Sequence, residues 1–186
     1  MAHYKRMIGE RIYLSPISME NIEDFMRWIN DPEIAHTTSF HSRVISLIQE
    51  TEFVEMLAKE GNIFSIVTHK DDTVIGNCSF FGIDETNRSA EIGIMIGEKE
   101  YQNKGYGTEA TNLLLKFGFE NRNYHSIHLH VFSFNERGIA CYEKVGFKPQ
   151  GVRREAVIRG QHKYDMIYMD ILADEYFQHR SQRKGG

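Results

Sequence analysis

The stretch Tyr101–Ala110 has the residue types and spacing of a phosphate-binding loop. It comes after an apolar run, Ala90–Gly97, and leads into a run with helical spacing, Thr108–Arg122. Gly105 and Gly107 have no Cβ, so the backbone can turn tightly there and come close to a ligand. The start of the helix adds N–H groups without helical partners and the positive end of the helix dipole. The predicted ligand is therefore an anion, best a phosphate or pyrophosphate.

Three kinds of glycine-rich phosphate-binding loop are alternative interpretations of this stretch. A Walker A loop requires Gly-Lys-Ser/Thr, whereas here Lys104 precedes Gly105. The dinucleotide fingerprint G-x-G-x-x-G/A is formally matched from Gly105 to Ala110, but several residues separate it from the preceding strand. The next predicted strand, His125–Phe132, also ends without the acidic residue that this fingerprint requires. The third candidate is the pattern Gln102-x-x-Gly105-x-Gly107.

The rest of the chain supplies the elements that must position this loop. Alternating or β-rich runs predict strands, and apolar residues at helical spacing predict helices. The predicted strands are 9–17, 63–68, 73–82, 89–96, 125–132, 147–158 and 163–171, and the predicted helices are 21–29, 44–60, 108–122 and 134–145. Residues 33–42 are predicted to form a polar loop or short turn, and Gly146 a helix C-cap. Short turns indicate an antiparallel meander, and a crossover helix indicates that 125–132 is parallel to 89–96.

Three segments in this order resemble the GNAT (GCN5-related N-acetyltransferase) superfamily, and within it the RimL and spermidine N-acetyltransferase branch. They are Ala90-Glu-Ile-Gly-Ile-Met-Ile-Gly97, the loop with Gln102-x-x-Gly105-x-Gly107, which is similar to the family's coenzyme A pyrophosphate loop, and Asn135-x(5)-Cys-Tyr-Glu-Lys-Val-Gly-Phe147. The resemblance implies the α/β (α+β) acyl-CoA acyltransferase fold. Its sheet would be mixed, mostly antiparallel, flanked by helices and splayed between strands 4 and 5. It also implies a single acetyltransferase domain over 1–186, with a core at about 9–175 and a mobile tail over 179–186.

Composition agrees with one soluble globular domain. The chain has 186 residues, of which 41% are hydrophobic and 26% charged. A net charge of −4 gives no general attraction for nucleic acid. Cys78 and Cys141 form no spaced motif and are interpreted as reduced thiols of a cytoplasmic protein. The sequence shows no signal-like start and no apolar run of the ~20 residues that a membrane span needs.

Acetyl transfer from a thioester to an amine requires a base for the ammonium and an acid for the leaving thiolate. The resemblance implies that Tyr142 is the general acid, and a phenol with a pKa near ~10 is protonated at neutral pH. The alternative is packing, because Tyr142 shares a helix face with Ile139. Glu91 shares a strand face with Gly93 and Met95 and is the candidate base, acting through water. A solvated or structural glutamate is the alternative, and some family members use water chains instead.

The resemblance also implies how the cofactor is held. Backbone N–H groups of Gln102–Gly107 would hold the pyrophosphate, and the main chain of Ile94–Ile96 would pair with the pantetheine arm. A backbone N–H near Met95 would polarise the acetyl carbonyl, and Asn135 would contact pantetheine. Asn103 stands where relatives often have Gly, but Asn tolerates left-handed backbone, so the loop should still close. The predicted cofactor-binding residues are Ile94, Met95, Ile96, Gln102, Asn103, Lys104, Gly105, Tyr106, Gly107, Thr108 and Asn135.

Other reactive side chains are assigned no chemistry. His125, His128 and His130 lie close in sequence but offer no closed ligand set, so no metal is predicted. Cys141 has no evident activating partner and is interpreted as a small buried residue. Trp28 lies where the family builds its acceptor pocket, with a core position as the alternative.

The predicted function is acetyl-CoA-dependent N-acetyl transfer to a primary amine, directly within a ternary complex. The acceptor is a polyamine, a protein N-terminal amine, an amino sugar or an antibiotic. One alternative is a non-catalytic acyl-CoA-binding sensor or scaffold, and another is a nicotinamide-binding oxidoreductase. Acetyl-CoA is the expected co-substrate, with no nucleic acid or membrane partner. A homodimer or higher homo-oligomer is expected from the family alone.

Overall fold

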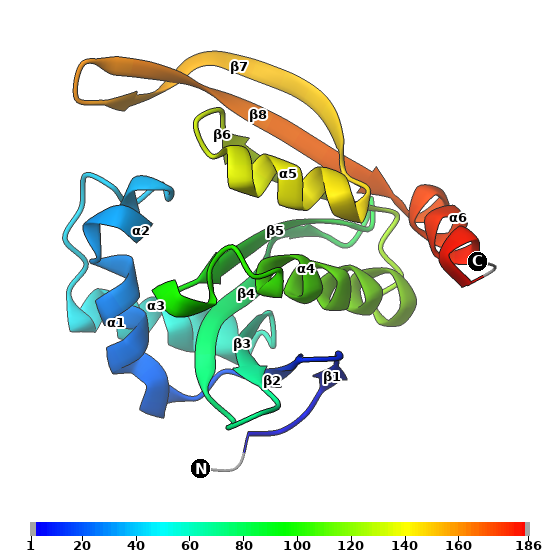
Figure 1. Ribbon diagram of the computed structural model, residues 1–186, viewed down its shortest axis with the longest axis horizontal. Coiled ribbons are helices and arrows are strands. Elements are labelled where there is room, and N and C mark those ends of the chain that lie inside the picture. The colour runs from blue at the N-terminus through cyan, green and yellow to red at the C-terminus, as the bar shows by residue number, and fades with distance from the viewer. Residues whose placement is uncertain (1–2, 185–186) are drawn as a thin grey trace. The chain divides into compact units, whose positions relative to one another are not determined.

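The structure is a computed structural model that describes residues 3–184 (Figure 1). Its strands are β1 (Met7–Ile8), β2 (Ile12–Pro16), β3 (Ile63–Thr68), β4 (Val74–Asp84), β5 (Ser89–Ile96), β6 (Ser126–Phe132), β7 (Lys148–Arg159) and β8 (His162–Leu172). Its helices are α1 (Ile22–Ile29), α2 (Pro32–His36), α3 (Leu47–Lys59), α4 (Tyr106–Lys116), α5 (Glu136–Val145) and α6 (Ala173–Lys184). A π-helical turn, Phe117–Asn121, extends α4. Within this described part, every helix is too short or too polar to cross a membrane.

The described chain divides into two compact units. The first unit consists of residues up to 79 together with 94–113, and the second of residues 80–93 together with those from 114 onward. Strands β4 and β5 and helix α4 contribute residues to both units. The described strands follow the sheet order β1-β2-β3-β4-β5-β6-β8-β7.

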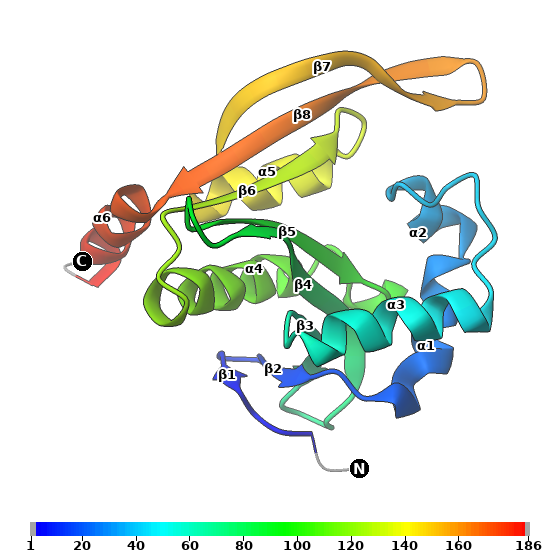
Figure 2. The ribbon, with the colours of Figure 1, turned by 180° about the vertical axis from the view of Figure 1, so that it is seen from behind.

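In the first unit, β1 pairs antiparallel with β2, β2 with β3 and β3 with β4. Helices α1, α2 and α3 gather beside one another, as Figure 2 shows. Their apolar side chains and those of β2, β3 and β4 form a core cluster of Tyr13, Phe25, Trp28, Ile34, Val54, Val67 and Val74. Strand β2 is buried on both faces, because Tyr13 joins this cluster while its neighbours Ile12 and Leu14 are also fully buried.

Helix α2 occupies part of the segment that the sequence predicted to be a polar loop or short turn. The Asp31 side chain accepts hydrogen bonds from the N–H groups of Glu33 and Ile34 at 2.9 and 3.3 Å. Pro32 takes the first helical position, where its missing N–H costs nothing and its fixed φ suits the helix. Pro32 therefore ends α1 as predicted but also starts a new helix.

A β-bulge in β4 lies beside the end of β5. Ile66 lies opposite Gly76, whereas Val67 lies opposite Val74, so Ile75 is the extra residue. The Ile75 carbonyl accepts hydrogen bonds from the N–H groups of Gly97 and Glu98 at 2.9 and 3.1 Å. These bonds fix the main chain just before the predicted phosphate loop.

In the second unit, β5 and β6 are parallel, and β6 with β8 and β7 with β8 are antiparallel. The registered pairing of β5 with β6 runs from Ser89–Ser126 to Glu91–His128. Both strands continue beyond these pairs, β5 to Ile96 and β6 to Phe132. The prediction of a mixed, mostly antiparallel sheet flanked by helices is confirmed.

The C-terminal part contains a predicted hairpin and a helix that the sequence analysis did not predict. β7 and β8 form the predicted hairpin, and Gly146 ends α5 in the left-handed region, with φ of 109°. Residues 179–184, which were predicted to be part of a mobile tail, belong to helix α6, and their mobility stays a prediction. Two ion pairs hold this helix in place. Glu175 of α6 pairs with Lys148, and Arg180 of α6 pairs with Glu120. Residues 185 and 186 of the predicted tail lie outside the described residues.

Trp28 is a core residue of the first unit. Its side chain is only 1% exposed, and its Nε1 donates to the Glu98 carboxylate at 3.2 Å. Gly97 makes this packing possible, since a Cβ at this position would lie 2.0 Å from the Trp28 ring. The core interpretation of Trp28 is confirmed, and Gly97 ties the indole to the end of β5.

Replacing Gly97→Ala should therefore destabilise the protein by about 1–3 kcal/mol, because the buried indole has no room to give way. Gly151→Ala is the matched control, since a Cβ there meets nothing within 4 Å. Urea unfolding followed by tryptophan fluorescence measures both variants. A lowered midpoint is expected for Gly97→Ala only, and equal midpoints would contradict the packing described here.

Candidate functional site

The predicted phosphate loop, Gln102–Gly107, is a tight turn that leads directly into α4. Asn103 and Gly105 both have positive φ, 59° and 83°. The expectation that Asn103 tolerates left-handed backbone is confirmed. Gln102 fixes the loop to β5, because its Nε2 donates to the Ile96 carbonyl at 2.9 Å. Asn103, Lys104 and Gly105 are exposed, so the turn is open to solvent.

The structure explains the glycines at positions 105 and 107 of the loop in different ways. Gly105 is required by its positive φ, which residues with a Cβ rarely adopt. Gly107 lies in the first turn of α4 with no positive φ, and a Cβ there would meet only Ile96, at 3.8 Å. Alanine would fit this space.

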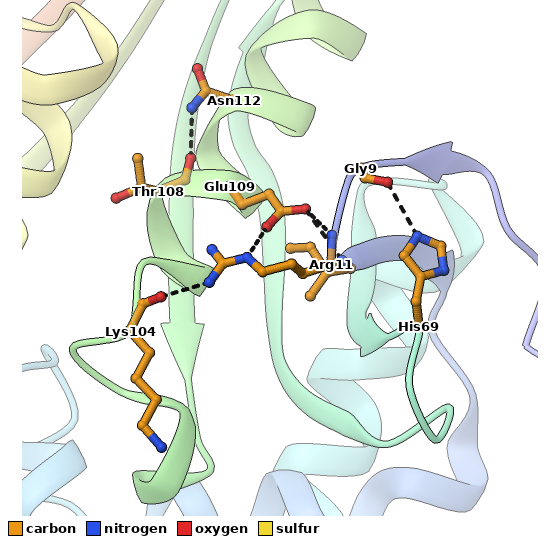
Figure 3. A network of polar contacts seen from close by, with 8 residues as sticks. Gly9, Arg11, His69, Lys104, Thr108, Glu109 and Asn112 are labelled. Atoms are coloured by element: carbon orange, nitrogen blue, oxygen red, sulfur yellow. Dashed lines mark hydrogen bonds and ion pairs between the residues drawn. The ribbon is translucent and has the colours of Figure 1, made fainter.

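Arg11, next to β2, holds the loop from outside (Figure 3). Its Nη1 donates to the Lys104 carbonyl at 2.8 Å, and its Nε donates to the Glu109 carboxylate at 2.9 Å. The guanidinium also lies over the Tyr106 ring, 4.4 Å from the centroid. Figure 3 shows the Lys104 side chain extending away from these contacts. Arg11 thus fixes one carbonyl of the loop and leaves the cation of Lys104 outside the network.

Glu109, in the first turn of α4, connects the helix to the start of β2. Its Oε1 accepts hydrogen bonds from the N–H groups of Arg11 and Ile12 at 2.8 and 3.2 Å. Gly9 gives it space, because a Cβ at residue 9 would lie 2.5 Å from this oxygen. A carboxylate here suits the helix dipole but would repel a phosphate bound at the same helix end. The ion pair with Arg11 offsets that repulsion.

The sequence analysis missed Arg11 and Glu109 as functional residues. The available signal was a carboxylate in the first turn of a predicted phosphate-binding helix, which requires a cationic partner. Nothing in the sequence pattern identified Arg11 as that partner, since the two residues are 98 positions apart.

The predicted pantetheine-binding stretch Ile94–Ile96 is shaped by the strand beside it. The Met95 carbonyl lies against Gly76, where a Cβ would be only 2.1 Å from the oxygen. The Met95 side chain packs on the core cluster of the first unit. Because Gln102 already occupies the Ile96 carbonyl, a cofactor arm would pair with other main-chain groups of this stretch. Gly76 is a further residue that the sequence analysis missed, although a glycine inside a strand pattern signals close backbone approach.

The predicted base, Glu91, is paired with a histidine of the second unit. Its Oε1 lies 2.6 Å from Nδ1 of His130 on β6. Hydrogen bonding to His130 is the main cause that lowers the pKa of the Glu91 carboxyl below its usual value, with desolvation acting in the opposite direction. A carboxyl with a lowered pKa is a weaker base than an ordinary one. The sequence analysis considered His130 only as a metal ligand.

The predicted acid, Tyr142, and the predicted contact residue Asn135 belong to the same helix segment. Burial raises the pKa of the Tyr142 phenol above its usual value, so the phenol keeps its proton at neutral pH. The ring packs edge-on against Phe147, with centroids 5.9 Å apart. Asn135 is the N-cap of α5, where its Oδ1 accepts the Gly138 N–H at 3.0 Å. Capping explains an asparagine here without a ligand.

Neither Cys78 nor Cys141 forms a disulfide, and Cys141, which was predicted to be buried, is only partly buried. Burial raises the pKa of the Cys78 thiol above its usual range. Over residues 3–184, no group of three or more His, Cys, Asp and Glu side chains is placed to hold a metal ion.

Comparison with known proteins identifies the family. The sequence model of the acetyltransferase (GNAT) domain matches residues 11–148. The chain belongs to the GNAT acetyltransferase family. The uncharacterized N-acetyltransferase p20 of Bacillus licheniformis is 28% identical to this GNAT enzyme over 172 residues, 90% of this chain and 96% of that protein. Spermidine N(1)-acetyltransferase of Escherichia coli (strain K12) is 34% identical over 111 residues, which are 59% of each chain.

The fold of this GNAT enzyme is shared by solved structures. The crystal structure of spermidine N-acetyltransferase from Vibrio cholerae in complex with CoA and spermine superimposes with a TM-score of 0.81 and 24% identity, over 91% of this chain and 99% of that one. Identity at this level shows the fold alone. With the family assigned, the predictions of fold, family and enzyme class are confirmed: the protein is an acetyl-CoA-dependent N-acetyltransferase.

The network around Arg11 predicts a specific effect on cofactor binding. Arg11→Met should raise the KM for acetyl-CoA about tenfold, since one charge-assisted hydrogen bond of ~1.4 kcal/mol is worth that factor. The kcat should change much less, because Arg11 holds the loop and not the reacting groups. Arg11→Lys should rescue only part of the effect, because an ammonium lacks the planar fork that reaches two acceptors at once.

Steady-state kinetics with varied acetyl-CoA measure this split. The control is Lys59→Met, which removes only an exposed 3.6 Å contact with Glu55. If Arg11→Met lowers kcat as strongly as it raises KM, the assignment of Arg11 to the loop alone is wrong.

Proposed function

We propose that this GNAT enzyme transfers the acetyl group of acetyl-CoA directly to a primary amine, within a ternary complex and without a covalent intermediate on the protein. The observation that carries the proposal is the Gln102–Gly107 turn at the start of α4, fixed by Arg11 and Glu109. Such a turn presents N–H groups and the positive end of a helix dipole to a pyrophosphate. We also propose that both units act as one acetyltransferase domain and that the enzyme works in the cytoplasm.

Tyr142 is assigned the role of general acid. When the C–S bond of the thioester breaks, the leaving thiolate needs a proton. The phenol of Tyr142 keeps its proton because burial raises its pKa, so it is available as a donor at neutral pH. Main-chain N–H groups near Met95 would stabilise the oxyanion of the tetrahedral intermediate.

The acceptor class proposed first is a polyamine. The similarity to spermidine N(1)-acetyltransferase of Escherichia coli supports this choice. The net charge of −4 suits a polycationic acceptor but does not select one. Protein N-terminal amines, amino sugars and aminoglycoside-like antibiotics are the other amines to test.

A thiol-release assay tests the proposal. Acetyl-CoA is offered with spermidine, spermine, N-terminal peptides, amino sugars and aminoglycosides, and thermal unfolding is followed with acetyl-CoA alone. Turnover with polyamines and thermal stabilisation by acetyl-CoA are expected. Stabilisation with turnover of another amine would replace the acceptor class. Stabilisation without any turnover would favour an acyl-CoA-binding module, and no stabilisation would refute the loop assignment.

Tyr142→Phe should keep the dissociation constant for acetyl-CoA within about twofold and lower kcat by about 10²–10⁴, the usual contribution of a general acid. The ring packing against Phe147 is retained, so stability should change little. Tyr164→Phe is the matched control, a phenol of the β8 strand with no assigned role. Unchanged turnover in Tyr142→Phe would remove Tyr142 from the mechanism.

A further inference from the structure

Glu91 and His130 form a carboxylate–imidazole pair on neighbouring strands of the second unit. The 2.6 Å contact joins Glu91 Oε1 to Nδ1 of the ring. At this distance Nδ1 carries the hydrogen and donates it to the carboxylate, and the neutral ring then has its lone pair on Nε2. The side chains are 30% and 34% exposed, so solvent or a ligand can reach the pair.

The pair lies where the parallel pairing of β5 and β6 ends. Glu91–His128 is the last registered pair, and His130 is two positions further along β6, on the same strand face as His128. The opposite face of β6 carries Ile127 and Leu129, which are both buried. His130 therefore belongs to the accessible face of the strand, beside the predicted splay.

We propose that His130 is the general base of the acetyl transfer and that Glu91 is its positioning residue. This inference rests on the proposed function, and it changes the role predicted for Glu91 from base to orienting carboxylate. A carboxylate that holds one ring nitrogen fixes the tautomer and stabilises the imidazolium that forms at the other. An imidazole is also better suited than a carboxylate to accept a proton near neutral pH.

The protons balance as follows. Nε2 of His130 takes one proton from the acceptor R–NH3⁺, directly or through one water, and the freed amine attacks the acetyl carbonyl carbon. The N–C bond forms and the C–S bond breaks. The nitrogen loses a second proton as the amide forms, and this proton replaces the one that Tyr142 gives to the thiolate. His130 finally releases its proton to solvent, so the products are the N-acetyl amine, CoA–SH and one proton.

Other charged or titratable groups face this pair and will shape its titration. His128 lies beside it on β6, and Tyr168 and Asp170 lie opposite His130 and His128 on β8. Arg159 of β7 stacks on Phe132, which is itself next to His130. The titratable groups beside the pair on β6 and β8 are therefore His128, Tyr168 and Asp170.

The pH dependence of kcat/KM with spermidine tests the proposal. His130→Gln should lower kcat/KM about 10²-fold near pH 7, and the deficit should shrink toward pH 10, because the free amine then exists without a base. Glu91→Gln should lower kcat/KM less than His130→Gln does and should weaken the preference for hydrogen on Nδ1, since the imidazole remains but an amide can also donate to its ring nitrogen. His125→Gln, which replaces an exposed histidine just before β6, is the control and should keep the wild-type profile.

A second measurement needs no acceptor. Nitrogen-15 spectra of the histidine rings at pH 8.5, assigned with His130→Gln, should show hydrogen on Nδ1 and a bare Nε2. The opposite tautomer, or a His130→Gln deficit that stays constant with pH, would overturn the proposal. If spermidine is not turned over at all, the proposed acceptor fails, and the tautomer alone decides the role of His130.

Discussion

The ion pair between Arg11 and Glu109 is the constraint on which the candidate cofactor loop depends. One side chain holds the loop carbonyl of Lys104, and the other accepts two N–H groups at the start of β2. These contacts join the loop, the helix and the strand directly. The pair also resolves a conflict of charge, because a helix start that is to bind phosphate carries a carboxylate of its own.

Three glycines allow main chain and side chains to approach where a Cβ would collide. Gly9 admits the Glu109 carboxylate, Gly76 admits the Met95 carbonyl, and Gly97 admits the Trp28 indole. These contacts fix the main chain at the end of β5 and at the start of α4, on either side of the loop. The geometry of the stretch predicted to hold pantetheine is thus set by residues that would not touch the cofactor themselves.

The second unit contains the residues that are proposed as acid and base. Tyr142 is kept protonated by burial, whereas Glu91 is kept ionised by its hydrogen bond to His130. Two titratable groups whose surroundings move their pKa values in opposite directions are the usual mark of divided acid and base roles. The contact that stabilises the Glu91 carboxylate also holds Nδ1 of His130, so the two side chains are oriented together.

The sequence by itself determined what depends on local rules. Glycine spacing located the loop, short turns and apolar periodicity predicted the order of most elements, and Asn103 and Gly146 took the left-handed conformations expected of them. The weakly apolar helix α6 and the short helix α2 were missed, because capping and ion pairs with distant residues stabilise them. Only the tertiary structure decided which partners meet. Arg11 finds Glu109 and His130 finds Glu91 across large sequence separations, and periodicity carries no information about such pairings.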